Sequence, residues 1–396
     1  MLTEAWRQPH MAPLTADSPD ALLERLLTED PPAPKQPCRL ADLIGDRKLV
    51  VYGCGDGLIT FSVFVLQKFD LRPEVLLDAR FAVPTVLEGI PAIAPADYCP
   101  SSELVKDAVA VITVGKTRYH PEIIASLRTL GFQCIILAMD IYEYHLSHAP
   151  RGFEQLGPAY FRERAADIRA AYALLADDPS REIFTKVLHT HVARMPVPIH
   201  HEPIEDQYFP RDLVLSRGIA RVINCGAYDG DTVRQLHARH GKIEALICLE
   251  PDADNFTRLC AYLAGQAGQL ANSVMAFPCG VWRDDTQLRF GGGQRINSSI
   301  CDDGAVVIQC VALDHVIPDF HPTYINMDIE GAEPEALRGA AGLIQRDRPD
   351  LGICVYHRPE HLWEIALYLH GLNLDYRFYL RNYTGFPAET VLYATA

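Results

Sequence analysis

The chain has 396 residues and a formal net charge of −15, and this excess of acid argues against nucleic acid or an anionic membrane as its main partner. The length allows two domains, and hydrophobic residues make up 48%, enough for a core in each. Eleven cysteines without a C-x-x-C pair favour buried, reduced thiols over a disulfide or zinc framework. No segment reaches the ~18 continuous apolar residues of a membrane span, and no signal-peptide pattern is present. We therefore expect a cytoplasmic protein.

The first half of the chain predicts a Rossmann-like domain. Residues 1–46 hold a helical pattern and a proline cluster, which we interpret as a helical arm and linker. A strand at 48–52 then leads into the turn Gly53-Cys54-Gly55-Asp56-Gly57, a helix at 58–68 and a strand at 74–78 that ends in Asp78. Alternating strands and helices of this length predict a doubly wound, mostly parallel sheet over residues 47–150. Further strands are expected at 108–114 and 133–138, with a helix at 121–130.

A helical bridge is expected over residues 151–210, with a break at Asp178-Pro179-Ser180 and a renewed helix at 183–191. The second α/β domain is placed at 211–396. Its last two strands lie about ten residues apart around Asn382, Thr384 and Gly385, as expected for an antiparallel hairpin. Strands are predicted at 220–225, 244–250, 273–279, 305–313, 323–328, 351–357, 375–380 and 389–394, with a short one within 282–290.

A glycine turn opens this second domain. Residues 224–232 follow an apolar strand and precede a helical pattern, and the next strand ends in Glu250. A glycine turn followed by a strand-end acid is typical of nucleotide binding, in which the acid accepts the ribose hydroxyls. The spacing G-x-x-x-G is not the G-x-G-x-x-G of a dinucleotide site. An adenosine with a small charged tail fits better, and S-adenosylmethionine is such a ligand.

Several motifs together resemble the FkbM family of S-adenosylmethionine-dependent methyltransferases. They are the turn at 224–232, Glu250, the run Asp328-Ile329-Glu330-Gly331-Ala332-Glu333 and the closing segment 389–394. The resemblance covers about residues 208–396 and implies a class I methyltransferase sheet with strand order 3-2-1-4-5-7-6. It favours O-methylation of a sugar, glycan or glycosylated metabolite, and leaves N-methylation of a peptide or amide open.

The expected donor site lies at the carboxyl ends of the first two strands of this domain, where ligands of open α/β sheets bind. Asn224 departs from the usual Asp of the family, so it offers a hydrogen bond without a charge. Thr232 can either touch the donor or cap the following helix. The expected cofactor-binding residues are Asn224, Gly226, Ala227, Tyr228, Gly230, Thr232, Glu250 and Pro251.

Two further strand ends carry the predicted catalytic residues, Asp328 and His357. Asp328 is expected beside the sulfonium as a general base, an orienter of the acceptor or a cation ligand, and His357 can deprotonate an alcohol near neutral pH. The acids at 328, 330 and 333 resemble an oxygen-ligand set for a divalent cation, although acids at a helix N-terminus need no ligand. We assign no metal ligands and leave a divalent cation open.

The acceptor is expected to meet Glu330, Arg377 and Arg381, although salt bridges across the hairpin explain the two arginines equally well. An alternative places the chemistry in the first domain, as an NAD-linked or nucleotide-sugar-modifying enzyme. No Tyr-x-x-x-Lys pair occurs in residues 47–150, which counts against hydride transfer there. A homodimer would be compatible with this organisation.

Overall fold

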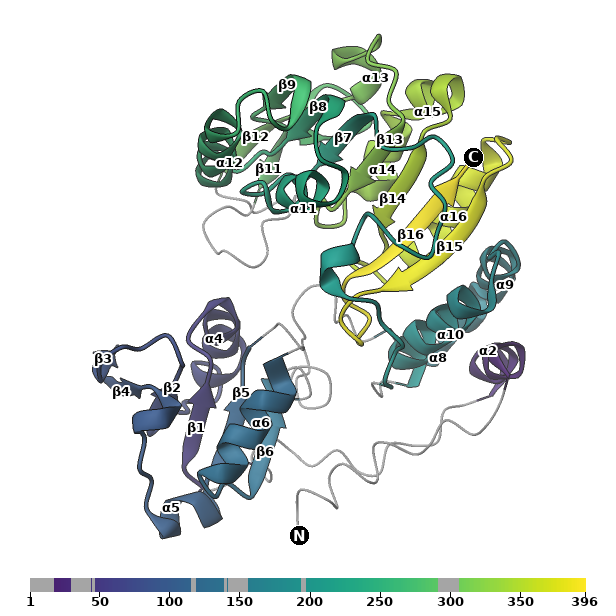
Figure 1. Ribbon diagram of the computed structural model, residues 1–396. Helices are drawn as coiled ribbons and strands as arrows, with labels where there is room; N and C mark the ends of the chain where they lie inside the picture. Colours follow the sequence, from purple (N-terminus) through teal and green to yellow (C-terminus); the bar gives the residue numbers. More distant parts are fainter. Residues whose placement is uncertain are drawn as a thin grey trace. The chain divides into compact units, whose positions relative to one another are not determined.

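The computed structural model describes residues 18–29, 44, 47–114, 119–138, 141, 156–193, 197–290 and 306–396. The chain divides into two compact units, Met1–Ala159 with His189–Val197 and Tyr160–Leu188 with Pro198–Ala396. Each unit contains one large, mainly parallel α/β sheet (Figure 1), which confirms the predicted fold class. Within the described ranges, no helix has the length and hydropathy needed to span a bilayer.

The first unit is built on a six-stranded sheet with the order β3-β4-β2-β1-β5-β6. The predicted helix at 58–68 instead begins at Asp56 and passes into a π-helical turn. The β3–β4 hairpin and α5 were not predicted, because the hairpin is largely exposed and has no alternating apolar pattern. The strands are β1 (Leu49–Tyr52), β2 (Val75–Leu77), β3 (Thr85–Leu87), β4 (Ile90–Ile93), β5 (Val109–Ile112) and β6 (Cys134–Leu137). The helices are α2 (Pro19–Thr28), α4 (Asp56–Phe61), η1 (Ser62–Leu66), η2 (Pro95–Asp97), α5 (Ser102–Asp107) and α6 (His120–Thr129).

Both faces of this sheet are covered. Leu49 and Val51 of β1 point into one apolar cluster, whereas Val50 and Tyr52 point into another. Side chains alternate across a strand, so a strand buried on both sides reads as a continuous apolar run. That is the pattern that made β1 predictable.

The second unit begins with helices α8 (Pro158–Glu163), α9 (Ala165–Ala173) and α10 (Asp178–Ala193). The predicted break in the bridge is present but was placed too late, because α9 ends at Ala173 and Asp178-Pro179-Ser180 already start α10. Proline is tolerated in a first helical turn, where its missing N–H needs no partner. Asp177 supports this start, since its Oδ1 accepts the backbone N–H of Ser180 at 2.9 Å.

The seven-stranded sheet has the order β15-β16-β14-β13-β7-β8-β9. Numbered along the domain and read from β9, this is 3-2-1-4-5-7-6, as predicted. The last strand, β16, runs antiparallel to both β14 and β15, which confirms the hairpin. The strands are β7 (Arg221–Cys225), β8 (Ile243–Leu249), β9 (Ala271–Phe277), β13 (Tyr324–Met327), β14 (Asp350–Cys354), β15 (Arg377–Asn382) and β16 (Thr390–Thr395).

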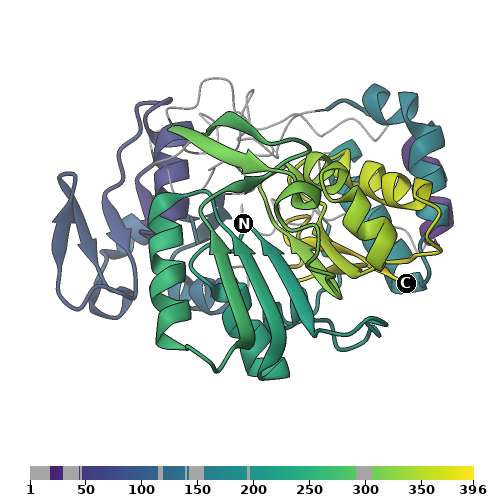
Figure 2. The same ribbon diagram turned by 90° about the horizontal axis from the view of Figure 1, so that it is seen from above.

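A smaller sheet, β10-β12-β11, takes up the predicted strand at 305–313. Figure 2 shows β7, β8 and β9 side by side, with α12 next to them. The small sheet comprises β10 (Gly280–Val281), β11 (Thr286–Phe290) and β12 (Val306–Val311). The helices are η4 (Ile204–Asp206), α11 (Asp231–His240), α12 (Ala253–Gly265), α13 (Leu313–Val316), α14 (Glu333–Arg338), α15 (Ala341–Asp347) and α16 (His361–Gly371).

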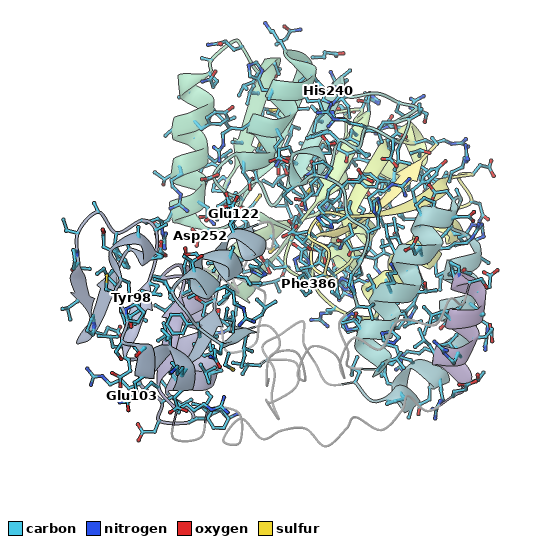
Figure 3. All side chains as sticks on the ribbon, turned by 60° about the horizontal axis from the view of Figure 1, so that its bottom comes forward. Tyr98, Glu103, Glu122, His240, Asp252 and Phe386 are labelled. Carbon is cyan, nitrogen blue, oxygen red and sulfur yellow. The ribbon has the colours of Figure 1, made fainter. Side chains whose placement is uncertain are left out.

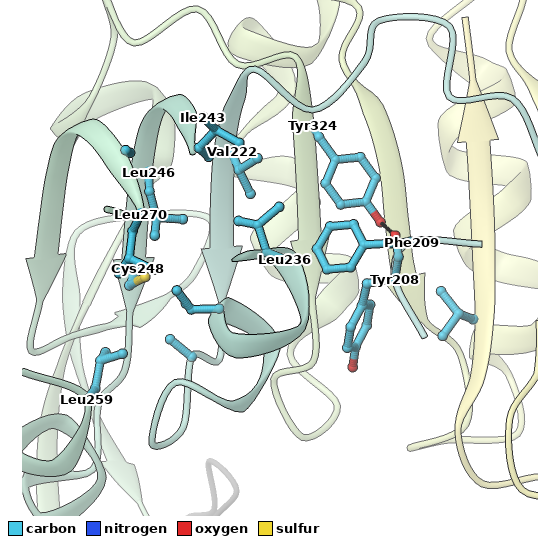
Figure 4. Packing of buried hydrophobic residues seen from close by; sticks show 14 of the residues in the cluster. Tyr208, Phe209, Val222, Leu236, Ile243, Leu246, Cys248, Leu259, Leu270 and Tyr324 are labelled. Atoms are coloured by element: carbon cyan, nitrogen blue, oxygen red, sulfur yellow. Dashed lines mark hydrogen bonds between the residues drawn. The ribbon is translucent and has the colours of Figure 1, made fainter. Parts of the chain in front are cut away.

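The core of the second unit fixes where a site can form. Central strands β7, β13 and β14 are almost wholly buried, and Figure 4 shows side chains from β7, β8 and β13 in the same apolar cluster as Phe209 and Leu236. Because β7, β8, β13 and β14 are parallel neighbours, their carboxyl ends meet at one edge. The segments after these strands hold Gly226, Glu250, Asp328 and His357.

Candidate active site

The glycine turn after β7 is compact because two of its positions need glycine. Gly226 has φ +81°, and a Cβ there would lie 1.9 Å from the carbonyl oxygen of Asp328. Gly230 has φ +92° and precedes α11. Between them, Tyr228 also has a positive φ of 47°. The turn is closed by the N–H groups of Gly226 and Ala227, which both donate to the Leu249 carbonyl at 3.0 Å.

Glu250 is held by this turn. Its Oε2 accepts the backbone N–H of Tyr228 at 2.8 Å, and its Oε1 accepts that of Asp252 at 2.9 Å. The residue is 6% exposed; burial raises its pKa, and the two backbone hydrogen bonds oppose that rise. The Asn255 side chain also forms a hydrogen bond with this carboxylate, so three of its roughly four acceptor positions are engaged within the protein. Asp252 lies at the start of α12 (Figure 3), where its side chain accepts N–H groups of the first turn.

Asn224 does not reach the end of its strand. It is 1% exposed, and its Oδ1 accepts Asn326 Nδ2 at 2.8 Å across the β7–β13 pair. This contact binds two neighbouring strands below the glycine turn. Thr232 is also buried, and its N–H donates to Asp231 Oδ1 at 2.7 Å inside the first turn of α11. Pro251 follows Glu250 and is partly buried.

Asp328, after β13, receives hydrogen bonds on both carboxylate oxygens. Tyr208 Oη donates to Oδ2 at 2.7 Å, and Tyr356 Oη donates to Oδ1 at 3.1 Å. His357 Nε2 lies 3.3 Å from Oδ1. Burial opposes ionisation of Asp328, but the hydrogen bonds from His357 and Tyr208 outweigh it and lower its pKa. Asp328 and His357 are therefore brought together, as the strand order predicted.

Glu333 holds the other side of the histidine. Its Oε1 lies 2.8 Å from His357 Nδ1 and accepts the N–H of Ile329 at 3.0 Å. His361 Nδ1 lies 3.4 Å from its Oε2. Burial disfavours a charge on His357, yet Glu333 and Asp328 prevail and raise its pKa well above the usual value. The same contacts hold the pKa of the fully buried Glu333 well below its usual range.

Asp328, Glu333 and His357 each place one possible metal-ligand atom within 4.8 Å of the other two. Among the described residues, this is the cluster that could hold a metal ion. His357 lies between the two carboxylates, its raised pKa favours a protonated ring there, and Glu333 Oε1 already accepts the Ile329 N–H. A cation would have to displace that proton. The described contacts therefore favour an ion-paired histidine over a metal centre.

The three residues predicted for the acceptor lie in different surroundings. Glu330 has φ +57° and leaves 46% of its side chain exposed, with its Oε2 3.8 Å from His357 Nε2. Arg377 is exposed over the Tyr379 ring. Arg381 is 3% exposed, and its Nε and Nη2 donate to Asp212 and Asp177 at 2.6 and 2.7 Å. This engagement favours a structural role for Arg381.

The first unit contains a similar turn whose acid is fully engaged. Asp78 Oδ2 accepts Cys54 N–H at 2.7 Å and Arg80 Nη2 at 2.8 Å. Its Oδ1 accepts both the backbone N–H and Nε of Arg80 at 3.0 Å. These four donors use all the acceptor positions of a carboxylate. Ribose hydroxyls have no place on Asp78 unless Arg80 moves.

Sequence reasoning missed three contributors to the site: Tyr208, Gln207 and the pairing role of Glu333. Gln207 Nε2 donates to Glu389 Oε2 at 2.6 Å, and burial, followed by the charge of Asp328, raises the pKa of Glu389 to about 7. Glu389 belongs to the closing motif, so its segment was visible in the sequence. Tyr208 and Gln207 precede the first strand of the sheet and carry no recognisable pattern.

The sequence and the fold were compared with known proteins. Residues 224–383 match the family model described as a methyltransferase FkbM domain. No functionally curated protein matched the sequence. The fold is similar to the crystal structure of methyltransferase FkbM from Methylobacillus flagellatus KT, with a TM-score of 0.64, 24% identity, and coverage of 95% of this chain and 98% of that one. That likeness extends over both units. The chain thus carries an FkbM methyltransferase domain, which includes the glycine turn, Glu250, Asp328 and His357.

Proposed function

We propose that this chain transfers the methyl group of S-adenosylmethionine to a hydroxyl of a sugar, glycan or glycosylated metabolite. The observation that carries the proposal is Glu250: a strand-end carboxylate fixed by two backbone N–H groups and joined by the Asn255 side chain, with acceptor capacity left for a ligand hydroxyl. A ribose hydroxyl of the donor can use that capacity. The matched domain over residues 224–383 supports the reaction class.

The charge around Asp328 suits such a donor. Asp328, Glu330, Glu333, Glu389 and the neighbouring Asp231 influence one another's ionisation, with His357 as their cationic partner. S-adenosylmethionine carries a sulfonium and an ammonium, and an acidic surrounding attracts both. An adenine dinucleotide, with its negative pyrophosphate, would be repelled from the same place.

The donor supplies an activated methyl group, so this chain has to align the acceptor and take its proton. A bound donor would supply a methyl group activated for attack by the acceptor oxygen, with the sulfur leaving as a neutral thioether, and His357 Nε2 would take the hydroxyl proton. A cationic donor beside Asp328 disfavours a second cation there, so donor binding lowers the pKa of His357 and frees Nε2. Glu333, 2.8 Å from Nδ1, keeps the ring oriented.

The same electrostatics favour a hydroxyl over an amine acceptor. Nearby carboxylates stabilise a protonated amine, and a protonated amine has no lone pair with which to attack the methyl group. An NAD-linked reaction in the first unit receives no support from Asp78, because its carboxylate is saturated.

Two measurements test the proposal. Calorimetric titration of the whole chain with S-adenosylhomocysteine should give one saturable site, whereas NAD should give none. Incubation with S-adenosyl-L-methionine bearing a trideuterated methyl group and a panel of neutral sugars, glycosides and nucleotide sugars should yield a product that gains CD3 in place of hydrogen. Binding of NAD without S-adenosylhomocysteine would move the chemistry to the first unit.

A further inference from the structure

Tyr208 adopts a backbone conformation that a tyrosine rarely takes. Its φ is +67°, in the left-handed region, and it is 3% exposed. It lies sixteen residues before the matched domain begins at 224. Non-glycine residues stay in this region only when their surroundings impose it, and such residues cluster at functional sites.

Two buried tyrosines impose the conformation. Tyr324 Oη donates to the Tyr208 carbonyl at 2.5 Å, and the Tyr208 N–H donates to Tyr393 Oη at 3.0 Å. Tyr383 lies 2.6 Å from Tyr393, hydroxyl to hydroxyl. The backbone of one residue is thus fixed from β13, from β16 and indirectly from β15. Packing of an aromatic ring alone would not need this arrangement.

The conformation directs the Tyr208 ring toward the carboxyl ends of the central strands, as Figure 4 shows. There its hydroxyl donates to Asp328 Oδ2 at 2.7 Å. Gln207 Nε2 lies 3.3 Å from the same hydroxyl as a second donor, so the hydroxyl's own hydrogen is left for Asp328. His357 contacts the other oxygen, Oδ1, and Tyr356 lies between the two oxygens, 3.1 Å from Oδ1 and 3.4 Å from Oδ2. Tyr208 therefore fixes the oxygen that the histidine does not.

We propose that Tyr208 is a positioning residue for the reaction. Its hydroxyl holds the Asp328 carboxylate ionised and in a single orientation, so that the carboxylate is correctly placed for both His357 and the acceptor. Tyr208 acts through Asp328 and does not touch the reacting atoms. For methyl transfer this inference rests on the proposed function. The hydrogen bond itself can be tested without any acceptor.

The test compares Tyr208→Phe with Tyr376→Phe. Phenylalanine keeps the ring and removes only the hydroxyl. Tyr376 is a matched control, since it is buried and donates to the Pro349 carbonyl at 2.7 Å, just before β14 begins and so at the opposite end of that strand from His357. With the acceptor found in the sugar panel, Tyr208→Phe should lower kcat roughly 10- to 100-fold, as expected for loss of a hydrogen bond to a charged group. The KM for S-adenosylmethionine should stay within about threefold, and Tyr376→Phe should leave kcat unchanged.

A double-mutant comparison separates positioning from general loosening. In an Asp328→Asn background, Tyr208→Phe should reduce kcat by less than about threefold, because the residue through which it acts is already altered. An equal reduction in both backgrounds, or an unchanged kcat in the single variant, would overturn the proposal.

A second readout needs no acceptor. The protein is labelled with 13C at the aspartate carboxyl carbons and titrated by NMR. The resonance that is missing in the Asp328→Asn variant is assigned to Asp328. The other titratable groups facing it (His357, Glu330, Glu333, Glu389, Cys354, Tyr356 and Asp231) are the same in every variant compared. Its pKa should rise by about one unit in Tyr208→Phe and stay at the wild-type value in Tyr376→Phe. A pKa unchanged in Tyr208→Phe refutes the inference even if the proposed reaction is real, and a shift supports it even if no acceptor is found.

Discussion

Replacing Glu250 with glutamine tests the donor site with the smallest change of shape. Glutamine keeps the length of the side chain but exchanges one carboxylate oxygen for a donor NH2. Both oxygens already face backbone N–H groups, those of Tyr228 and Asp252. The NH2 group of the glutamine must therefore point at one of these donors, and the side chain loses acceptor capacity that the ribose hydroxyls need.

The size of the effect follows from these contacts. A hydrogen bond to a charged group contributes about 1.5–3 kcal/mol, and Glu250→Gln removes at least one such bond to the ligand. Affinity for S-adenosylhomocysteine should fall by roughly 10- to 150-fold, at 1.4 kcal/mol per factor of ten. The NH2 group also faces a backbone N–H in the free protein and weakens the turn that forms the donor site. The loss of affinity should therefore be at least about 10-fold.

Calorimetry on the whole chain measures the change, with the thermal midpoint of unfolding as a check on folding. Asp78→Asn is the matched control: it alters a strand-end carboxylate of the same geometry that is saturated by Cys54 and Arg80. It should leave S-adenosylhomocysteine affinity within about threefold. An unchanged affinity in a folded Glu250→Gln variant would refute the assignment of Glu250 to the ribose.

Three features of the site give further predictions. Asp328→Asn should lower kcat at least about 100-fold with little change in S-adenosylhomocysteine affinity, since it removes the carboxylate needed in the transition state; equal loss in both would make Asp328 a binding residue. The pKa of Glu389 is raised to about 7, so this group is largely protonated at pH 6 and ionised at pH 8. The affinity ratio of S-adenosylmethionine to S-adenosylhomocysteine should therefore rise about fivefold over that range, from roughly 1 kcal/mol of added attraction to the sulfonium; a flat ratio would place the sulfonium elsewhere. EDTA should leave the rate unchanged, because the raised pKa of His357 favours a proton over a metal ion in the Asp328 cluster; loss of activity restored by Mg²⁺ would contradict that reading. Gly226→Ala should unfold more readily than Gly230→Ala, because its Cβ would meet the Asp328 carbonyl at 1.9 Å, whereas the Gly230 Cβ would meet the Tyr262 ring at 2.9 Å; chemical denaturation compares the two, and equal stabilities would go against this reasoning.

The sheet of the second unit could be predicted because its strands are short apolar runs that end at punctuating residues. Continuous burial on both faces makes β7, β13 and β14 recognisable as central strands. The order of the strands was predicted from the family resemblance, and the observed strand pairing confirms that order. Most strand ends of this sheet were displaced by one or two residues, but the fifth strand was expected to reach His357 and ends at Cys354. The α10 start was misread because Pro179 breaks a helix interior and also favours a first turn.

The pairing of Asp328 with His357 was predictable, because both follow neighbouring parallel strands. The roles of Glu333 and Tyr208 were not. Glu333 lies at the start of a helix, where an acidic residue is favoured in any case. The sequence therefore gave no separate indication that it contacts His357. Tyr208 reaches Asp328 only because Tyr324 and Tyr393 turn its backbone, and three side chains converging from distant strands leave no local pattern.

The two units show how a single position decides whether a strand-end acid is open to a ligand. In both, the acid accepts a turn N–H and the backbone N–H of the residue two places later: Asp78 from Cys54 and Arg80, Glu250 from Tyr228 and Asp252. The side chain at that later position then differs. Arginine folds back and fills the two remaining acceptor positions of Asp78, whereas the carboxylate of Asp252 has no proton to donate and instead accepts N–H groups at the start of α12. The backbone geometry is therefore shared, and the arginine or aspartate two residues after the acid separates a saturated carboxylate from one that, even with the Asn255 hydrogen bond, keeps acceptor capacity for a ligand hydroxyl.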